Sequence, residues 1–105
     1  MVKERGQRGG VSPLGDALAG FLRGAKLDRR LREAEVFAAW RAALGPQLAE
    51  RACAVRFERG ELTVEVVSAA LLGELSSFTG ERHRQAANAR LGGDRIHSVS
   101  FKPRR

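Results

Sequence analysis

The chain has 105 residues, of which 43% are hydrophobic and 30% charged, and this length and composition are typical of one soluble globular domain. No apolar run approaches the roughly 20 residues that span a bilayer, and the amino terminus lacks the apolar core of a signal peptide, so a cytoplasmic protein is predicted. The lone Cys53 cannot form an internal disulfide, which agrees with a reducing compartment.

The formal net charge of +7 favours an anionic partner, and much of this charge lies at the two ends of the chain. Three basic residues and one acidic residue in positions 1–10 give +2, and three basic residues among the last five give +3. We expect residues 1–11 to form a disordered basic arm, residues 12–102 a single domain and residues 103–105 a basic tail. The basic residues of these ends are Lys3, Arg5, Arg8, Lys102, Arg104 and Arg105.

The first predicted element is a helix that begins near residue 12. Ser12 is suited to cap it, Pro13 suits its first turn, and Gly24 is the expected end. Its apolar residues follow at helical spacing on one face, and they are Leu14, Leu18, Phe21 and Leu22.

A second helix is predicted from Asp28, which can cap it, to the pair Gly45 and Pro46, which ends it. Residues 46–52 can add a short turn of helix. The only tryptophan, Trp40, shares the apolar face of this helix, so we expect it to anchor a core rather than to stack on a nucleic-acid base. The residues of this face are Leu31, Val36, Phe37, Trp40 and Leu44.

From residue 53 the apolar period changes to two, which is typical of strands. The first strand is predicted to turn Cys53, Val55 and Phe57 to one face, with Cys53 as a small buried hydrophobic residue. Residues 59 and 60, Arg and Gly, form the turn of a β-hairpin. The second strand is predicted to turn Leu62, Val64 and Val66 to the same face.

A third helical element is predicted over residues 69–91, with Ser68 as its cap and a bend or break near Thr79 and Gly80. Its predicted core-facing residues are Leu71, Leu72, Leu75, Phe78, Ala86 and Ala89. A last strand follows, in which His97, Val99 and Phe101 alternate. The order ααββαβ predicts a small α+β sandwich, in which a three-stranded sheet carries helices on one face.

Enzymatic chemistry has little support in the sequence. His83 and His97 lie on different predicted elements, and together with one cysteine they give no zinc spacing. No Walker loop, nucleophile elbow or dinucleotide fingerprint is present. We therefore predict neither catalytic residues nor a metal or other cofactor.

Two internal clusters of basic residues suggest either a solvated face or contact with nucleic-acid phosphates, and the sequence favours neither over the other. Sequence-independent phosphate contact predicts binding that weakens steeply with salt. The first cluster lies around the predicted connection between the first two helices, includes Arg32 and is offset only by Asp28. The second lies on the later half of the third helix beside His83. The candidate nucleic-acid-binding residues are Lys3, Arg5, Arg8, Arg23, Lys26, Arg29, Arg30, Arg82, Arg84, Arg90, Lys102, Arg104 and Arg105.

Taken in order, the motifs VFAAWRAALGPQLAERA, RFERGELTVEVVSAALLGEL and RLGGDRIHSVSF resemble the bacterial DciA-type replicative helicase loader family. The resemblance covers roughly residues 12–102. One departure is Leu71, which stands where many members carry a tryptophan. The positions that carry the resemblance are Trp40, Gly45, Leu62, Val64, Val66, Ser68, Glu74, Leu75, Val99 and Phe101.

The resemblance implies a fold similar to a K-homology module and a non-enzymatic role in DNA replication. Members bind the hexameric DnaB-type replicative helicase and help to place it on DNA, so the implied partners are this helicase and DNA, single-stranded or duplex, in the nucleoid. No membrane and no small-molecule substrate are expected. The alternative is a K-homology-like RNA-binding module in translation or RNA metabolism, although the chain has no G-x-x-G motif between its early helices.

Overall fold

The computed structural model describes residues 13–104, without the side chains of Pro13, Leu14 and Asp16. The chain divides into two units, with the boundary after Leu31. Helix α1 (Pro13–Leu44) contributes to both units and begins at Pro13, as predicted. The expected cap Ser12 lies outside the described residues.

The expected helix end at Gly24 is wrong, because α1 continues past this residue to Leu44 and is 32 residues long in total. A glycine costs a helix about 1 kcal/mol relative to alanine, and here its neighbours Arg23, Ala25 and Lys26 are strong helix formers. No proline lies beyond Gly24 to stop the helix before Gly45, which adopts a positive φ of 87°. The cap predicted at Asp28 is wrong for the same reason.

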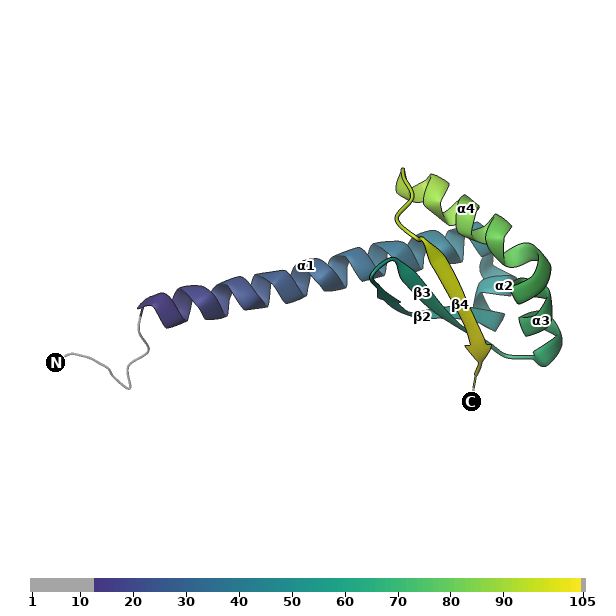
Figure 1. Cartoon of the computed structure of the whole chain (residues 1–105), viewed down its shortest axis with the longest axis horizontal. Helices are drawn as coiled ribbons and strands as arrows, with labels where there is room; N and C mark the ends of the chain where they lie inside the picture. The colour runs from purple at the N-terminus through teal and green to yellow at the C-terminus, as the bar shows by residue number, and fades with distance from the viewer. Residues whose placement is uncertain (1–12, 105) are drawn as a thin grey trace. The chain divides into compact units, whose positions relative to one another are not determined.

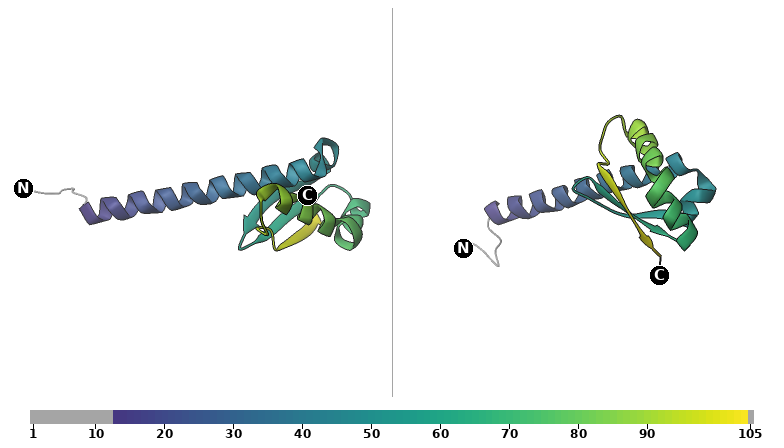
Figure 2. Two further views of the ribbon diagram at one scale, coloured as in Figure 1. Left: turned by 90° about the horizontal axis from the view of Figure 1, so that it is seen from above. Right: turned by 45° about the vertical axis from the view of Figure 1, so that its right-hand side comes forward.

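The second unit, Arg32–Arg105, holds the other helices and all the strands. Its strands form one sheet in the order β2-β3-β4, with β2 antiparallel and β4 parallel to the central β3 (Figure 1). Figure 2 shows helices packed against this sheet, and the predicted α+β class and ααββαβ order are confirmed. The elements that follow α1 are α2 (Pro46–Arg51), β2 (Ala52–Glu58), β3 (Glu61–Val66), α3 (Ala69–Glu74), the π-helical segment η1 (Leu75–Thr79), α4 (Gly80–Leu91) and β4 (Ser98–Pro103).

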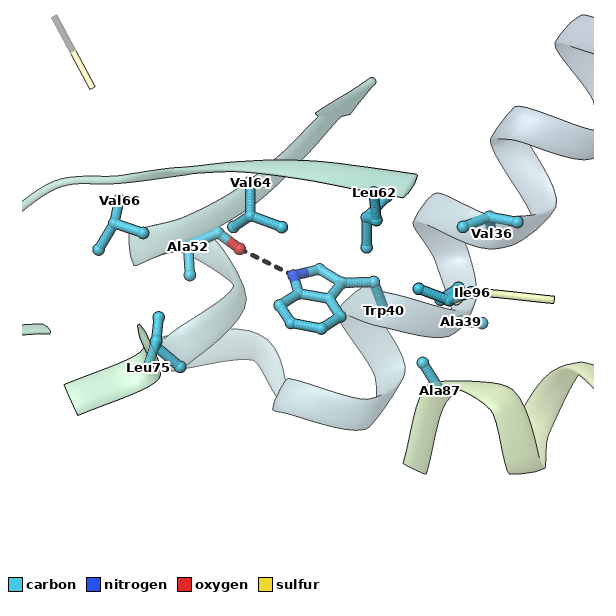
Figure 3. Close-up of a cluster of buried hydrophobic side chains, with 10 residues drawn as sticks. All are labelled: Val36, Ala39, Trp40, Ala52, Leu62, Val64, Val66, Leu75, Ala87 and Ile96. Carbon is cyan, nitrogen blue, oxygen red and sulfur yellow. Dashed lines mark hydrogen bonds between the residues drawn. The ribbon is translucent and has the colours of Figure 1, made fainter. Parts of the chain in front are cut away.

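Trp40 lies in the hydrophobic core between the end of α1 and the sheet (Figure 3). Only 1% of its surface is exposed, and its Nε1 donates a hydrogen bond of 3.1 Å to the carbonyl oxygen of Ala52. The predicted role of Trp40 as a core anchor is confirmed. The predicted helix face around it is confirmed for Val36, which is buried, but not for Leu31, which is exposed.

The hairpin has the predicted buried face on β3 but not on β2. Leu62, Val64 and Val66 are buried, as expected. In β2 a β-bulge between Ala54 and Arg56 leaves the intervening residue without a partner on β3.

The bulge changes which residues of β2 face the core. Ala52 and Ala54 precede it and lie on the core side, and Phe57 returns to that side after it. The prediction is therefore right for Phe57 and wrong for Cys53, which is half-buried, and for Val55, which is exposed. One inserted residue accounts for both errors, because it shifts a pattern of period two by one step.

The helical run from α3 to α4 contains a similar one-residue shift. In η1 the N–H of Gly80 donates to the carbonyl oxygen of Leu75, five residues earlier, so this turn holds one residue more than an α-helical turn. Phe78, expected in the core, is 80% exposed. After the shift, Ala87 is buried in the place that regular spacing assigns to Ala86.

Gly80 is the residue that permits this turn. A Cβ built on it would overlap the carbonyl oxygen of Leu75 and lie 2.7 Å from the ring of Phe101. The irregularity falls where the sequence predicts a bend, and its form is a π-helical turn rather than a break.

The last strand begins later than predicted, at Ser98, and His97 precedes it in an exposed position. Val99 and Phe101 pack against the core, as expected. The buried Ile96 lies just ahead of the strand and is held by Asn88 of α4, which receives the Ile96 N–H at 2.8 Å and donates to its carbonyl oxygen at 2.9 Å.

Candidate nucleic-acid interface

The first basic cluster lies on the part of α1 that belongs to the first unit. Four of its five predicted residues lie there, whereas Arg32 is the first residue of the second unit, and all five are exposed. Arg23, Lys26 and Arg30 are spaced by three and four residues, so they form one strip along the helix, about 10 Å long. We call these three residues the α1 basic strip. Arg29 lies three residues after Lys26 and seven after Leu22, so it is next to the strip on the side of the helix that carries Leu22. Asp28 is the only acidic residue among positions 17–31.

The second predicted cluster, on α4, does not come together as one basic surface. Arg82 and Arg90 are exposed. Arg84 is half-buried and donates hydrogen bonds to Glu81 at 2.9 and 2.5 Å and to the carbonyl oxygen of Ile96 at 2.7 Å. This ion pair lowers the pKa of Glu81 and raises that of Arg84. The guanidinium of Arg84 therefore joins α4 to the segment before β4.

Of the carboxyl-terminal basic residues, Lys102 lies in the edge strand β4 and Arg104 follows that strand. Lys102 is exposed and lies beside Glu65 of β3 in the parallel register. Arg104 is exposed, and its backbone N–H donates to the carbonyl oxygen of Val66 at 2.9 Å. The four remaining candidates lie outside the described residues, and they are Lys3, Arg5, Arg8 and Arg105.

Other exposed arginines were not among the predicted candidates. Arg59 occupies the hairpin turn with a positive φ of 53°, and Arg41 and Arg51 lie in the last turns of α1 and α2. Arg56 pairs with Glu58 at 2.6 Å. The exposure of Arg41, Arg51 and Arg59 could have been predicted from the sequence, because residues in turns and at helix ends usually have exposed side chains.

A cleft of about 350 Å³ lies between β4 and the run formed by η1 and α4. Both apolar and polar side chains line it, but the guanidinium of Arg84 is already engaged there. No three His, Cys, Asp or Glu side chains within residues 13–104 form a group that could hold a metal ion. The lining residues are Leu75, Ser76, Gly80, Glu81, Arg84, His97, Ser98, Val99 and Phe101.

The strand-to-helix corner after β3 carries much of the family resemblance. Ser68 caps α3, because its Oγ accepts a hydrogen bond of 3.2 Å from the N–H of Leu71. A comparison with family models matches residues 13–101 to the family described as "Dna[CI] antecedent, DciA". The chain belongs to the DciA family. A comparison with curated protein sequences finds no match.

Membership of the DciA family implies a role in loading the DnaB-type helicase and an interaction with that helicase. The family is not known to be catalytic. None of the helices in the described part of the chain has the length and apolar character needed to cross a bilayer. The side chain of Leu71 packs half-buried against the core of this DciA domain.

His83 is a packing residue of the DciA domain. Its ring meets that of Trp40 edge to face, with 6.2 Å between the ring centroids. Burial lowers the pKa of His83, the charge of Arg82 lowers it further, and Glu74 partly opposes both. The imidazole is therefore mostly neutral at neutral pH, and it adds little to the positive charge of α4.

Proposed function

We propose that this DciA-family protein is a non-enzymatic adaptor that binds the DnaB-type replicative helicase and DNA and assists the loading of the helicase. The family match over residues 13–101 carries this proposal. The net charge of +7 and the exposed basic residues on α1 support its DNA-binding part.

DNA contact is proposed to be electrostatic and independent of sequence. The α1 basic strip lies fully exposed along a helix, an arrangement in which arginine and lysine can neutralise successive phosphates. Arg84 is left out of this proposed set because its guanidinium already donates within the chain. The proposed contacts are Arg23, Lys26, Arg29, Arg30, Arg82, Arg90, Lys102 and Arg104, with Lys3, Arg5, Arg8 and Arg105 from the ends of the chain.

The helicase part is tested by mixing the full chain with its cognate helicase and separating the mixture by size. A complex at low micromolar concentration is expected. If the two proteins elute apart at that concentration, the partner claim is wrong.

The DNA part is tested by the salt dependence of binding. Replacing Arg23, Lys26 and Arg30 by Gln is expected to weaken DNA binding. The slope of the logarithm of the binding constant against the logarithm of the salt concentration should become less steep by up to about three. Deleting residues 1–10 tests the amino-terminal arm in the same way. A salt slope that neither change alters would rule out both regions as phosphate contacts.

The second candidate is a K-homology-like RNA-binding module, which the observed ααββαβ order also suits. Such modules clamp the backbone with a G-x-x-G loop between helices, whereas α3, η1 and α4 follow one another here with no loop between them. Competition of labelled single-stranded DNA against structured RNA separates the two: preferential displacement by RNA would favour the second candidate.

A further inference from the structure

Large apolar side chains are exposed in a row on the first part of α1. Of the eight that are exposed in the described chain, five fall in one stretch of 14 residues, and the remaining three are scattered as Val55, Val67 and Phe78. Single exposed apolar residues are normal, but five large ones within 14 residues of one helix mark an interaction surface. The five are Leu18, Phe21, Leu22, Leu27 and Leu31, and we call residues 17–31 the exposed α1 segment.

The first three of these residues form an anchor row. Leu18, Phe21 and Leu22 are separated by three and one positions, so they lie on one face of the helix. The same helix uses this spacing again at Val36, Ala39 and Trp40, which are buried in the core. The anchor row therefore has the pattern of a helix face that packs against another apolar surface, and Phe21 is 70% exposed.

A second row runs along the opposite side of the exposed α1 segment. Leu27 lies about two and a half turns from Leu18, which places the two side chains on opposite sides of the helix. Leu27 and Leu31 continue a line that begins with Gly20 and Gly24, and a Cβ at Gly24 would meet no atom within 4 Å. Apolar surface on two sides fits a groove or a pair of helices, whereas a lipid surface would cover one side only.

The charge of the exposed α1 segment indicates what kind of partner surface would cover its apolar rows. The α1 basic strip lies between the two apolar rows, and Asp28 is the only acidic residue of the exposed α1 segment. A partner that covers the rows must therefore meet three positive charges, which acidic side chains at the rim of an apolar groove would satisfy. An antiparallel pair of two copies of this helix would instead set one basic strip beside the other.

We propose that the exposed α1 segment docks as a helix into an apolar groove rimmed by carboxylates on the replicative helicase, with Leu18, Phe21 and Leu22 as anchors. This inference rests on the proposed function and names the surface of the chain that binds the helicase. The α1 basic strip meets either the acidic rim or DNA phosphates, so docking of this segment and DNA contact by these three residues are alternative states of the chain. Apolar anchors supply most of the affinity in such helix-in-groove contacts, and the basic strip favours encounter with an acidic rim.

The test compares matched variants of the full chain in binding to the cognate helicase, measured by anisotropy of a labelled chain. The double variant Phe21→Ala with Leu22→Ala is expected to bind at least about tenfold more weakly than the unaltered chain. Phe78→Ala removes an equally large exposed side chain elsewhere and is expected to change the dissociation constant by less than about twofold. Thermal unfolding of the three proteins checks that each is folded.

The outcomes separate this inference from the proposed function. If the unaltered chain does not bind the helicase, both are overturned. If it binds and the double variant binds equally well, the docking surface is wrong and the proposed function stands. Light scattering of the chain alone adds a further outcome: a dimer that the double variant abolishes would show that a second copy covers the anchor row, and would overturn the inference.

Discussion

The two halves of α1 carry the same apolar spacing but differ in what surrounds them. Trp40, in the later half, is 1% exposed, whereas Phe21, in the earlier half, is 70% exposed. The comparison shows that helical periodicity predicts an apolar face but does not say whether the same chain covers it. A face that the chain leaves uncovered is evidence about partners rather than about the fold.

The largest expected effect tests this difference directly. Trp40→Ala removes the centre of the core and the hydrogen bond to Ala52, so it should lower the free energy of unfolding by about 3–5 kcal/mol. Phe21→Ala removes exposed surface and should change it by less than about 0.5 kcal/mol. Urea unfolding followed by circular dichroism measures both. Equal losses would mean that the first half of α1 is also packed in the folded chain.

A smaller effect on stability is expected for substitution of Gly80, and it compares a tightly packed position with an open one within the second unit. Gly80→Ala must displace the ring of Phe101 or the carbonyl oxygen of Leu75, at a cost of about 1–3 kcal/mol in the free energy of unfolding. The matched control is Gly73→Ala, where a Cβ meets no atom within 4 Å and helix propensity should add about 1 kcal/mol of stability. Thermal denaturation compares the two, and opposite signs are expected.

The smallest effect is a pH dependence of stability that arises at His83 of α4, whose ring packs against Trp40 in the buried half of α1. The pKa of His83 is lowered from its ordinary value of 6.5 mainly by burial, so the unfolded chain binds the proton more tightly than the folded chain. Its contribution to stability is therefore complete above about pH 6.5 and declines as the pH falls toward the lowered pKa. Unfolding in urea at pH 7.5 and 5.5 should show lower stability at the acidic pH.

The control for this titration is His83→Gln, which keeps a polar side chain but cannot titrate in that range. Its unfolding free energy should differ less between the two pH values than that of the unaltered chain. An unchanged difference would assign the pH dependence to other groups.

The parts of the fold that follow from local pattern could be predicted from the sequence. The alternation of Leu62, Val64 and Val66, the capping position of Ser68 and the apolar setting of Trp40 each depend on residues close in sequence. The order ααββαβ follows from the changes of period between these stretches.

The errors arose where one residue is added to a regular element. The β-bulge at Val55 and the π-helical turn before Gly80 each leave composition unchanged but shift the side chains on one side of the irregularity to a different face from those on the other side. The opposite error occurred at Gly24, where a glycine was expected to end a helix that its neighbours sustain.

The candidate site was predictable to a similar degree. Arg23, Lys26 and Arg30 were expected around the connection between two helices, and all three are exposed. They align as one strip only because α1 continues through Gly24. The engagement of Arg84 could not be predicted, because its acceptor is the backbone carbonyl of Ile96, twelve residues away on a different element. Sequence spacing identifies which charges can lie together, but tertiary contacts decide which of them are free.

The π-helical turn of η1 has a consequence for how this element can vary during evolution. A turn that closes over five residues is equivalent to an α-helical turn with one residue inserted, and the phase of α4 has already absorbed that insertion. Deletion of Ser77 would therefore return η1 to regular helix while Ala87 and Asn88 keep their buried positions. Length variation of one residue at this point is compatible with the fold, and it changes chiefly whether an aromatic side chain is presented at the surface.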